Sequence, residues 1–173
     1  MGRRFGNDAP RKGVGLHVSG TTGDGAETGT LPADVRELFD APNYVHLSTL
    51  RADGSPRSWV VWVGLEGDRL LICTHDSNWK AEDMRRDPRV SLSVVDLANP
   101  YRMAAIQGRV VEVRPDPDCR FMDPISMKYT SAPFPSRDPE RVCFVIEAVH
   151  AGARHLDFLR HNPGPTDPHG RGS

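Results

Sequence analysis

Short segments in which hydrophobic and polar residues alternate run through most of the chain between residues 44 and 156. Alternation with a period of two, in segments rich in β-branched and aromatic residues, is typical of β-strands. The pattern predicts strands at 44–50, 57–65, 69–75, 89–96, 101–115 and 141–156. Tight-turn sequences at 53–54 and 66–68 join the first three strands, so we expect residues 44–75 to form an antiparallel meander.

Three other segments have the composition and spacing of short helices: residues 31–41, 77–88 and 116–130. Pro42 and Pro88 end the first two, and Pro124 is expected to break the third. The strands follow one another through short turns and do not alternate with helices. We therefore predict a mainly β fold, an antiparallel barrel of six strands with short helices on its outside or at its ends.

The chain has 173 residues, which suits one globular domain with extensions at its ends. Residues 1–28 and 159–173 contain few large apolar side chains and no periodicity, so we predict disordered tails around a folded domain at 29–158. The net charge of −1 gives no overall attraction to nucleic acid, and no apolar run is long enough to span a membrane. We expect a cytoplasmic protein that binds neither nucleic acid nor membranes.

The three cysteines, Cys73, Cys119 and Cys143, show neither the spacing of a zinc site nor that of a disulfide framework. Cys73 and Cys143 lie within apolar strand segments, so we expect both thiols to be buried and unreactive. The seven histidines are scattered and form no HxxxH or HExxH motif. The sequence therefore predicts no metal site.

The most specific local feature is a lysine at the start of the second predicted helix. In the segment THDSNWK (74–80) a strand ends, Ser77 is placed to cap the helix, and Lys80 falls in the first turn. A cation there faces the positive end of the helix dipole, which costs roughly 0.3–1 kcal/mol. An anionic group between Lys80 and the free backbone N–H groups would reverse this cost. The segment thus indicates a phosphate or carboxylate site; the alternatives are exposure of Lys80 to water or an ion pair with Asp76 or Asp83.

Two tryptophans, Trp59 and Trp62, lie three residues apart on one predicted strand and therefore point to opposite faces. We expect one of them to pack in the core. The other is available to border a planar ligand or a subunit interface, and packing of both in the core is the alternative.

Three groups of residues have the order and spacing of motifs from a known superfamily: Thr49, Asp53, Gly54, Pro56, Val61 and Trp62; Lys80, Arg85, Arg86, Asp87, Pro88, Arg89 and Val90; and Lys128, Tyr129 and Pro135. With them the chain resembles the pyridoxamine-phosphate-oxidase-like split-barrel superfamily. Within it, the chain is similar to the actinobacterial branch that uses the deazaflavin coenzyme F420. The resemblance covers about residues 31–156.

The resemblance implies a split barrel that forms a homodimer, with two cofactor sites at the subunit interface. It also implies which residues of this chain hold the cofactor. The cofactor phosphate is expected at Thr74, Ser77, Asn78 and Lys80, and the flat ring along Arg57, Ser58, Trp59, Val60 and Val61. Lys128, Tyr129 and Arg141 are expected to shape the substrate end of the site.

The function that follows is an F420-dependent oxidoreductase, in which the reduced deazaflavin delivers a hydride to a small electron-poor organic acceptor. The cofactor would carry the redox chemistry, and the protein would bind and orient it. Two alternatives stay open. One is an oxidoreductase that uses FMN on the same fold, and the other is a protein that binds a cofactor or a tetrapyrrole without turnover. The sequence assigns no catalytic acid or base.

Overall fold

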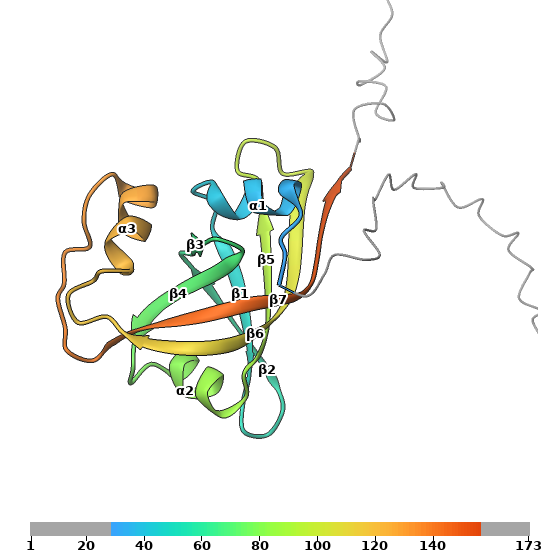
Figure 1. The fold of residues 1–173 in the computed structure, drawn as a ribbon. Helices are drawn as coiled ribbons and strands as arrows, with labels where there is room; N and C mark the ends of the chain where they lie inside the picture. The colour runs from blue at the N-terminus through green and yellow to red at the C-terminus, as the bar shows by residue number, and fades with distance from the viewer. Residues whose placement is uncertain (1–28, 157–173) are drawn as a thin grey trace, which may run out of the picture.

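The structure is a computed structural model that describes residues 29–156 (Figure 1). The predicted tails and the last two residues of the predicted domain lie outside this range. The described elements are α1 (Ala33–Asp40), β1 (Val45–Leu50), β2 (Pro56–Val61), β3 (Gly64–Glu66), β4 (Arg69–His75), α2 (Trp79–Arg86), β5 (Arg89–Val95), β6 (Arg102–Pro115), α3 (Met122–Thr130) and β7 (Arg141–His155).

The strands form one seven-stranded sheet in the order β2-β1-β5-β6-β7-β4-β3, and every neighbouring pair is antiparallel. The sheet curves around a shared core (Figure 1). Because β2 and β3 end this order and do not pair with each other, the barrel stays open along one side. The prediction of a mainly β antiparallel barrel is confirmed, with seven strands in place of six.

Strand β5 illustrates why the alternating pattern produces this sheet. Its buried and exposed positions alternate without a break. Val90, Leu92 and Val94 point into the core, while Ser91 and Ser93 lie on the outer face. A strand with one apolar face is stable when that face is buried, so the core side of the barrel follows directly from the sequence.

The predicted meander over residues 44–75 is wrong. The predicted strand 57–65 is divided at Trp62 and Val63 into β2, which pairs with β1, and β3, which pairs with β4. Strand β4 then pairs with β7, at the other end of the sheet from β1. The chain changes partner within one apolar segment, and alternation alone cannot show such a change because it is local. The turns themselves are confirmed, with Gly54 and Gly67 at positive φ.

Two clusters of apolar side chains hold the helices to the sheet. The larger cluster fills the barrel and includes Val35, Leu38 and Phe39 of α1 and Ala81 and Met84 of α2. The smaller cluster lies between α3 and the other face of β4 and β7. In Figure 1, α1 and α2 lie at opposite ends of the barrel and α3 lies to one side.

The third predicted helix begins later than expected and is not broken at Pro124. Pro124 lies in the first turn of α3, where a proline ring is tolerated because the backbone N–H has no partner within the helix. Asp116 satisfies the two backbone N–H groups at the helix start, those of Phe121 and Met122. A buried carboxylate, rather than a local cap, therefore fixes where α3 begins.

Candidate functional site

The start of α2 places Lys80 in the first turn, as the sequence predicts, but the capping residue differs. The cap position is occupied by Asn78, and no side chain caps the helix. The Asn78 amide donates instead to the buried Thr74 hydroxyl at 2.8 Å. Ser77, the predicted cap, lies 2.7 Å from Nδ1 of His75 and is exposed. The turn between β4 and α2 is thus held by contacts between side chains.

Lys80 is half-buried, and its ammonium lies 5.2 Å from the centre of the Trp59 ring. Among residues 29–156 it has no hydrogen-bond acceptor and no carboxylate partner. Asp76 pairs with Arg85, and Asp83 pairs with other cations, so neither forms the predicted alternative ion pair. Burial lowers the pKa of Lys80 below its ordinary value because the charged form loses water. An anion beside Lys80 would stabilise the charged ammonium and raise its pKa again.

Arg57 of β2 lies next to this lysine environment. Its guanidinium is 4.8 Å from the centre of the Trp79 ring and 5.8 Å from that of Trp59. One nitrogen lies 3.4 Å from the Asp83 carboxylate. Nε of Arg57 and Nε1 of Trp59 are buried without a hydrogen-bond partner in the described part of the chain. A buried donor without an acceptor is costly, so two such donors in one place favour a bound group rich in acceptors.

Asp83 joins α2 to the β1–β2 hairpin, a role that the sequence motifs do not indicate. Its carboxylate accepts hydrogen bonds from Thr49 at 2.9 Å and from Arg86 at 2.7 Å. Burial by itself raises the pKa of Asp83, but the hydrogen bonds from Arg86 and Thr49 and the charge of Arg57 together bring it below its ordinary value. In the sequence, an acidic residue beside Met84 on the buried side of α2 is the feature that indicates such a contact.

The residues predicted along the cofactor ring divide between two faces of β2. Arg57, Trp59 and Val61 point inward, and Trp59 and Val61 pack against the main core. Ser58 and Val60 point outward: the Ser58 hydroxyl lies 2.9 Å from that of Ser48, and Val60 is 63% exposed. Since β2 is an edge strand, a flat group lying against that edge can reach side chains of both faces.

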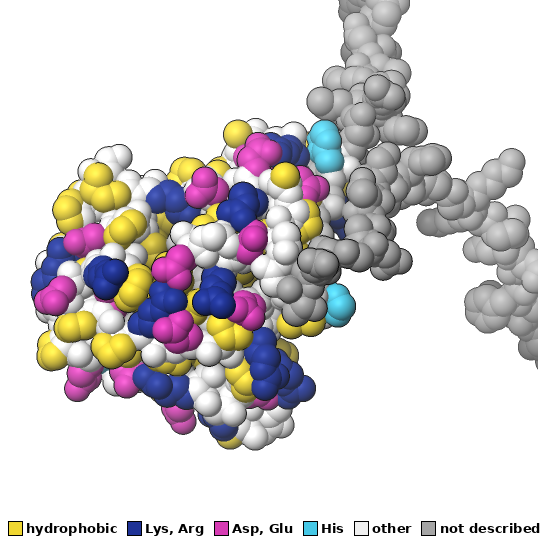
Figure 2. Space-filling model, in the orientation of Figure 1, with side chains coloured by type: hydrophobic (Ala, Val, Ile, Leu, Met, Phe, Trp, Pro, Cys, Tyr) yellow, Lys and Arg dark blue, Asp and Glu magenta, His cyan; other side chains and the backbone are white. Residues whose placement is uncertain are grey.

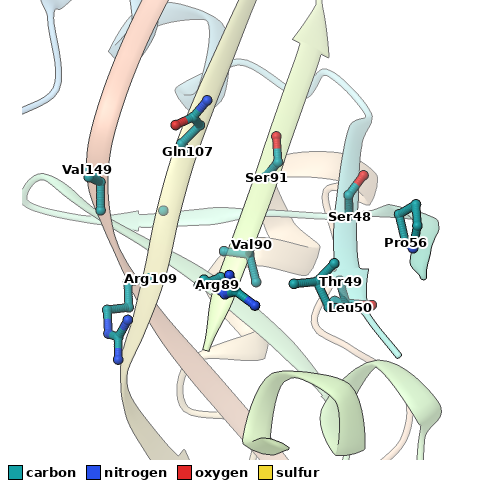
Figure 3. Close-up of a pocket in the computed structure, with 11 residues that line it drawn as sticks. Ser48, Thr49, Leu50, Pro56, Arg89, Val90, Ser91, Gln107, Arg109 and Val149 are labelled. Atoms are coloured by element: carbon teal, nitrogen blue, oxygen red, sulfur yellow. The ribbon is translucent and has the colours of Figure 1, made fainter. Parts of the chain in front are cut away.

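Two cavities flank the β1–β2 hairpin. The larger, about 610 Å³, lies on the outer face of β1, β5 and β6 (Figure 3), where Arg89 and Arg109 lie below Ser48, Ser91 and Gln107. The smaller, about 290 Å³, is bounded by the hairpin and α2 and is lined by Arg51, Ala52, Asp53, Arg57, Trp79, Glu82, Asp83 and Arg86. Of the residues predicted to bind the cofactor, Arg57 lines the smaller cavity and none lines the larger one.

Lys128 and Tyr129 lie on α3, away from α2 (Figure 1). The Lys128 ammonium donates to the Phe39 carbonyl at 3.0 Å, and burial lowers its pKa to about 8. The Tyr129 hydroxyl donates to the Asn43 carbonyl at 2.8 Å and accepts from the Val63 N–H at 3.3 Å. The contacts of both residues bind α3 to the barrel.

The two tryptophans point to opposite faces, as predicted. Trp59 packs against the main core, whereas Trp62 packs against the smaller cluster. The ring of Trp62 stacks on that of Tyr129, with centres 5.0 Å apart and an angle of 4° between the planes. Trp62, the tryptophan outside the main core, thus packs against an aromatic side chain of α3.

Arg141 is buried and lies at the start of β7, opposite His75 of β4. Its guanidinium stacks on the Phe134 ring at 4.3 Å, and its Nε has no partner among the described residues. Adjacent residues of a strand point to opposite faces. The side chains of Arg141 and His75 therefore lie on the other face of the sheet from that of Thr74, although the backbone at Arg141 pairs directly with the end of β4.

Within residues 29–156, no three His, Cys, Asp or Glu side chains gather as they would around a metal ion. None of the helices in that range combines the length and apolar character needed to cross a membrane. On the face shown in Figure 2, basic and acidic side chains are interspersed. That face has no broad basic surface of the kind that neutralises a nucleic-acid backbone.

Comparison with known proteins gives both a family and a set of structural neighbours. A model of the pyridoxamine 5'-phosphate oxidase family matches residues 31–155. No curated protein matches the chain. Among solved structures, an F420 reductase is 29% identical with a TM-score of 0.65, and the match covers 70% of this chain and 98% of that chain.

Two further neighbours share the fold at lower identity. A conserved hypothetical protein from Mycobacterium tuberculosis is 22% identical with a TM-score of 0.58, covering 77% of this chain and 94% of that chain. A FAD-binding protein from Mesorhizobium loti is 20% identical with a TM-score of 0.54, covering 76% and 100%. The family match spans nearly the whole described barrel, and the chain therefore belongs to the pyridoxamine 5'-phosphate oxidase family.

Proposed function

We propose that this protein is an oxidoreductase that binds coenzyme F420 and transfers a hydride between the reduced deazaflavin and a small electron-poor organic acceptor. One observation carries the proposal. Lys80, Arg57 and Trp59 bring together a half-buried ammonium and two buried N–H donors that lack acceptors in the described part of the chain. Similarity to an F420 reductase at 29% identity supports this choice of cofactor.

The residues around Lys80 at the start of α2, which we call the α2 corner, are suited to hold and orient a large anionic cofactor. Lys80 and Arg57 supply positive charge toward an anionic group, and the Trp59 indole supplies an N–H donor. Asp83 fixes Arg57, and Asn78 fixes the turn before Lys80 through Thr74. The deazaflavin supplies the hydride chemistry when bound. The contribution of the protein is positioning, since these side chains are already held by neighbours.

We also propose that the working unit is a homodimer. The outer face of β2, β1 and β5 carries small hydroxyl side chains and the exposed Val60 and Val95, 63% and 38% exposed. Arg89 lies at one end of this face, and the small uncharged side chains along the rest of it would let a second copy approach closely. The larger cavity lies on this same face, next to the hairpin that carries Arg57. A second copy there would enclose the edge of β2 and complete the site.

Titration of the purified protein with F420 and with FMN, followed by fluorescence, tests the proposal. We expect binding of F420 and a loss of about 1–3 kcal/mol of affinity in Lys80→Met, which removes a charged donor and keeps the stem over Trp59. Arg85→Met is the matched control, because it removes the same charge from the same helix at a residue that pairs with Asp76. Its affinity should stay close to that of the unchanged protein.

The outcomes separate the alternatives. Equal affinity in Lys80→Met and the unchanged protein contradicts the anion role. Tight binding of FMN and none of F420 identifies the FMN-dependent alternative. Binding of F420 without consumption of its reduced form by any enone or quinone acceptor identifies a carrier. Sedimentation of the same samples reports the assembly, and a monomer that binds F420 at full affinity rules out a site shared by two copies.

A further inference from the structure

Two of the three cysteines face each other across the sheet. Cys73 of β4 and Cys143 of β7 are direct partners in the antiparallel ladder. Both belong to the cluster beneath α3, so their side chains lie on the same face. Cys143 is fully buried, whereas Cys73 is partly exposed. The structure thus brings together thiols that are far apart in sequence and that expose unequal surfaces to solvent.

The backbone geometry of this pair suits a disulfide. Directly opposed residues of an antiparallel pair have Cα atoms about 4.5–5.5 Å apart. Disulfides span Cα separations of roughly 4.4–6.8 Å. The ladder continues regularly on both sides, with Ile72 opposite Phe144 and Thr74 opposite Val142. A bond between the sulfur atoms therefore requires no change in strand register.

A positively charged side chain, Arg141, lies near the two thiols. Arg141 precedes Cys143 by two residues on β7 and so lies on the same face. The pKa of Cys73 is raised, first by its hydrogen bond with the Cys143 thiol and next by burial, while the charge of Arg141 acts in the opposite direction. The Cys73 thiol is therefore protonated at neutral pH, and it reacts faster as the pH rises.

We propose that Cys73 and Cys143 form a redox-active cross-strand dithiol, which hydroperoxides oxidise to a disulfide between β4 and β7. The dithiol does not depend on the cofactor, because the strand ladder and the exposure of Cys73 suffice to form it. It replaces the sequence-based expectation that both are unreactive. Cys73 is the residue that oxidant reaches from solvent, and Cys143 is the residue that closes the bond.

The reaction balances in two steps. The Cys73 sulfur attacks one oxygen of the hydroperoxide, the O–O bond breaks, and a sulfenic acid forms while the other oxygen leaves with the thiol proton as an alcohol or water. The Cys143 sulfur then attacks the Cys73 sulfur, the S–S bond forms, and the S–O bond breaks with release of water. Two thiols lose two hydrogens, and one hydroperoxide is reduced.

Peptide mapping of the full-length protein after treatment with hydrogen peroxide tests this proposal. Free thiols are alkylated under denaturing, non-reducing conditions, and the protein is digested with trypsin. The three cysteines fall in different peptides, because basic residues separate them. We expect a linked pair of peptides containing Cys73 and Cys143, alkylated Cys119, faster linkage at higher pH, and full reversal by dithiothreitol.

Other products overturn the proposal: a sulfinic or sulfonic acid at Cys73 without linkage, a disulfide through Cys119 or between two chains, or unmodified thiols throughout. Cys119→Ser is the matched control and should link as the unchanged protein does. In Cys143→Ser, Cys73 should stop at sulfenic acid, which a dimedone probe captures. The mapping of the unchanged chain decides the question even where the buried Cys143 variant fails to fold.

Discussion

A lysine lies beside an aromatic ring both in the α2 corner, around Lys80, and in the α3 corner, around Lys128 and Tyr129. The Lys80 ammonium lies 5.2 Å from the centre of Trp59, and that of Lys128 lies 4.9 Å from the centre of Tyr129. Burial lowers the pKa of both. Only Lys128 also has an acceptor in the described chain, the carbonyl of Phe39 at the end of α1. The ammonium of Lys128 therefore has a hydrogen-bond acceptor, whereas that of Lys80 has none among the described residues.

Hydrogen-bond partners distinguish a corner that only packs from one that is suited to bind a ligand. At the α3 corner the polar groups of Lys128 and Tyr129 bond to backbone groups of neighbouring elements, so the corner is complete. At the α2 corner the internal bonds centre on Asp83, and donors of Arg57 and Trp59 stay without partners. Burial of unsatisfied donors costs stability, and a ligand that accepts from them recovers that cost.

The largest expected effect comes from Asp83→Asn. It leaves Arg57 and Arg86 without their carboxylate, so we expect a loss of about 3 kcal/mol in the free energy of unfolding. Because the folded pKa of Asp83 is lowered, its stabilising effect is complete above the pKa of the unfolded state and disappears as the pH falls through the folded value. Urea unfolding of both proteins from neutral to acidic pH measures the loss of stability and its dependence on pH. Glu82→Gln, at an exposed neighbour, is the control and should change stability by less than about 0.5 kcal/mol.

Tyr129→Phe should cost about 1–3 kcal/mol of stability, because the Asn43 carbonyl and the Val63 N–H both lose a partner. The stacking on Trp62 is kept, so the effect isolates the hydroxyl. Tyr44→Phe is the control, since Tyr44 is 51% exposed and touches the same ring. Thermal unfolding reports stability, and fluorescence titration reports F420 affinity. A variant of normal stability that loses affinity would place Tyr129 in the binding site, as the family resemblance implies.

Lys128→Met should have the smallest effect, about 1 kcal/mol, because the lost bond to Phe39 is partly offset by removal of a buried charge. Its signature is a pH dependence. The folded pKa, about 8, lies below that of the unfolded chain, so the unfolded state binds more protons between the two values. In that range the stability of the unchanged protein should rise with pH relative to the variant. A flat difference across this range would contradict the buried position of Lys128.

Features contained within a few residues can be predicted from the sequence, whereas contacts between distant segments cannot. Alternation located the strands, and turn sequences located Gly54 and Gly67, because both signals are contained within a few residues. Helical spacing placed Lys80 in the first turn of α2 for the same reason. The sequence predicts Ser77 as the cap of that helix, but Asn78 occupies the cap position. Asn78 is held there by Thr74 at the end of β4, a contact that helix patterns do not include.

The positions of the strands and their apolar faces can be predicted from the sequence, because burial of one face imposes a period of two. The pairing of the strands depends on the three-dimensional fold. The fold places β4 beside β7, so that Cys73 faces Cys143, and it brings Asp83 to Arg57 and Lys128 to Phe39. These contacts join segments distant in the chain, and they depend on how the whole sheet curves and closes, which no local pattern records.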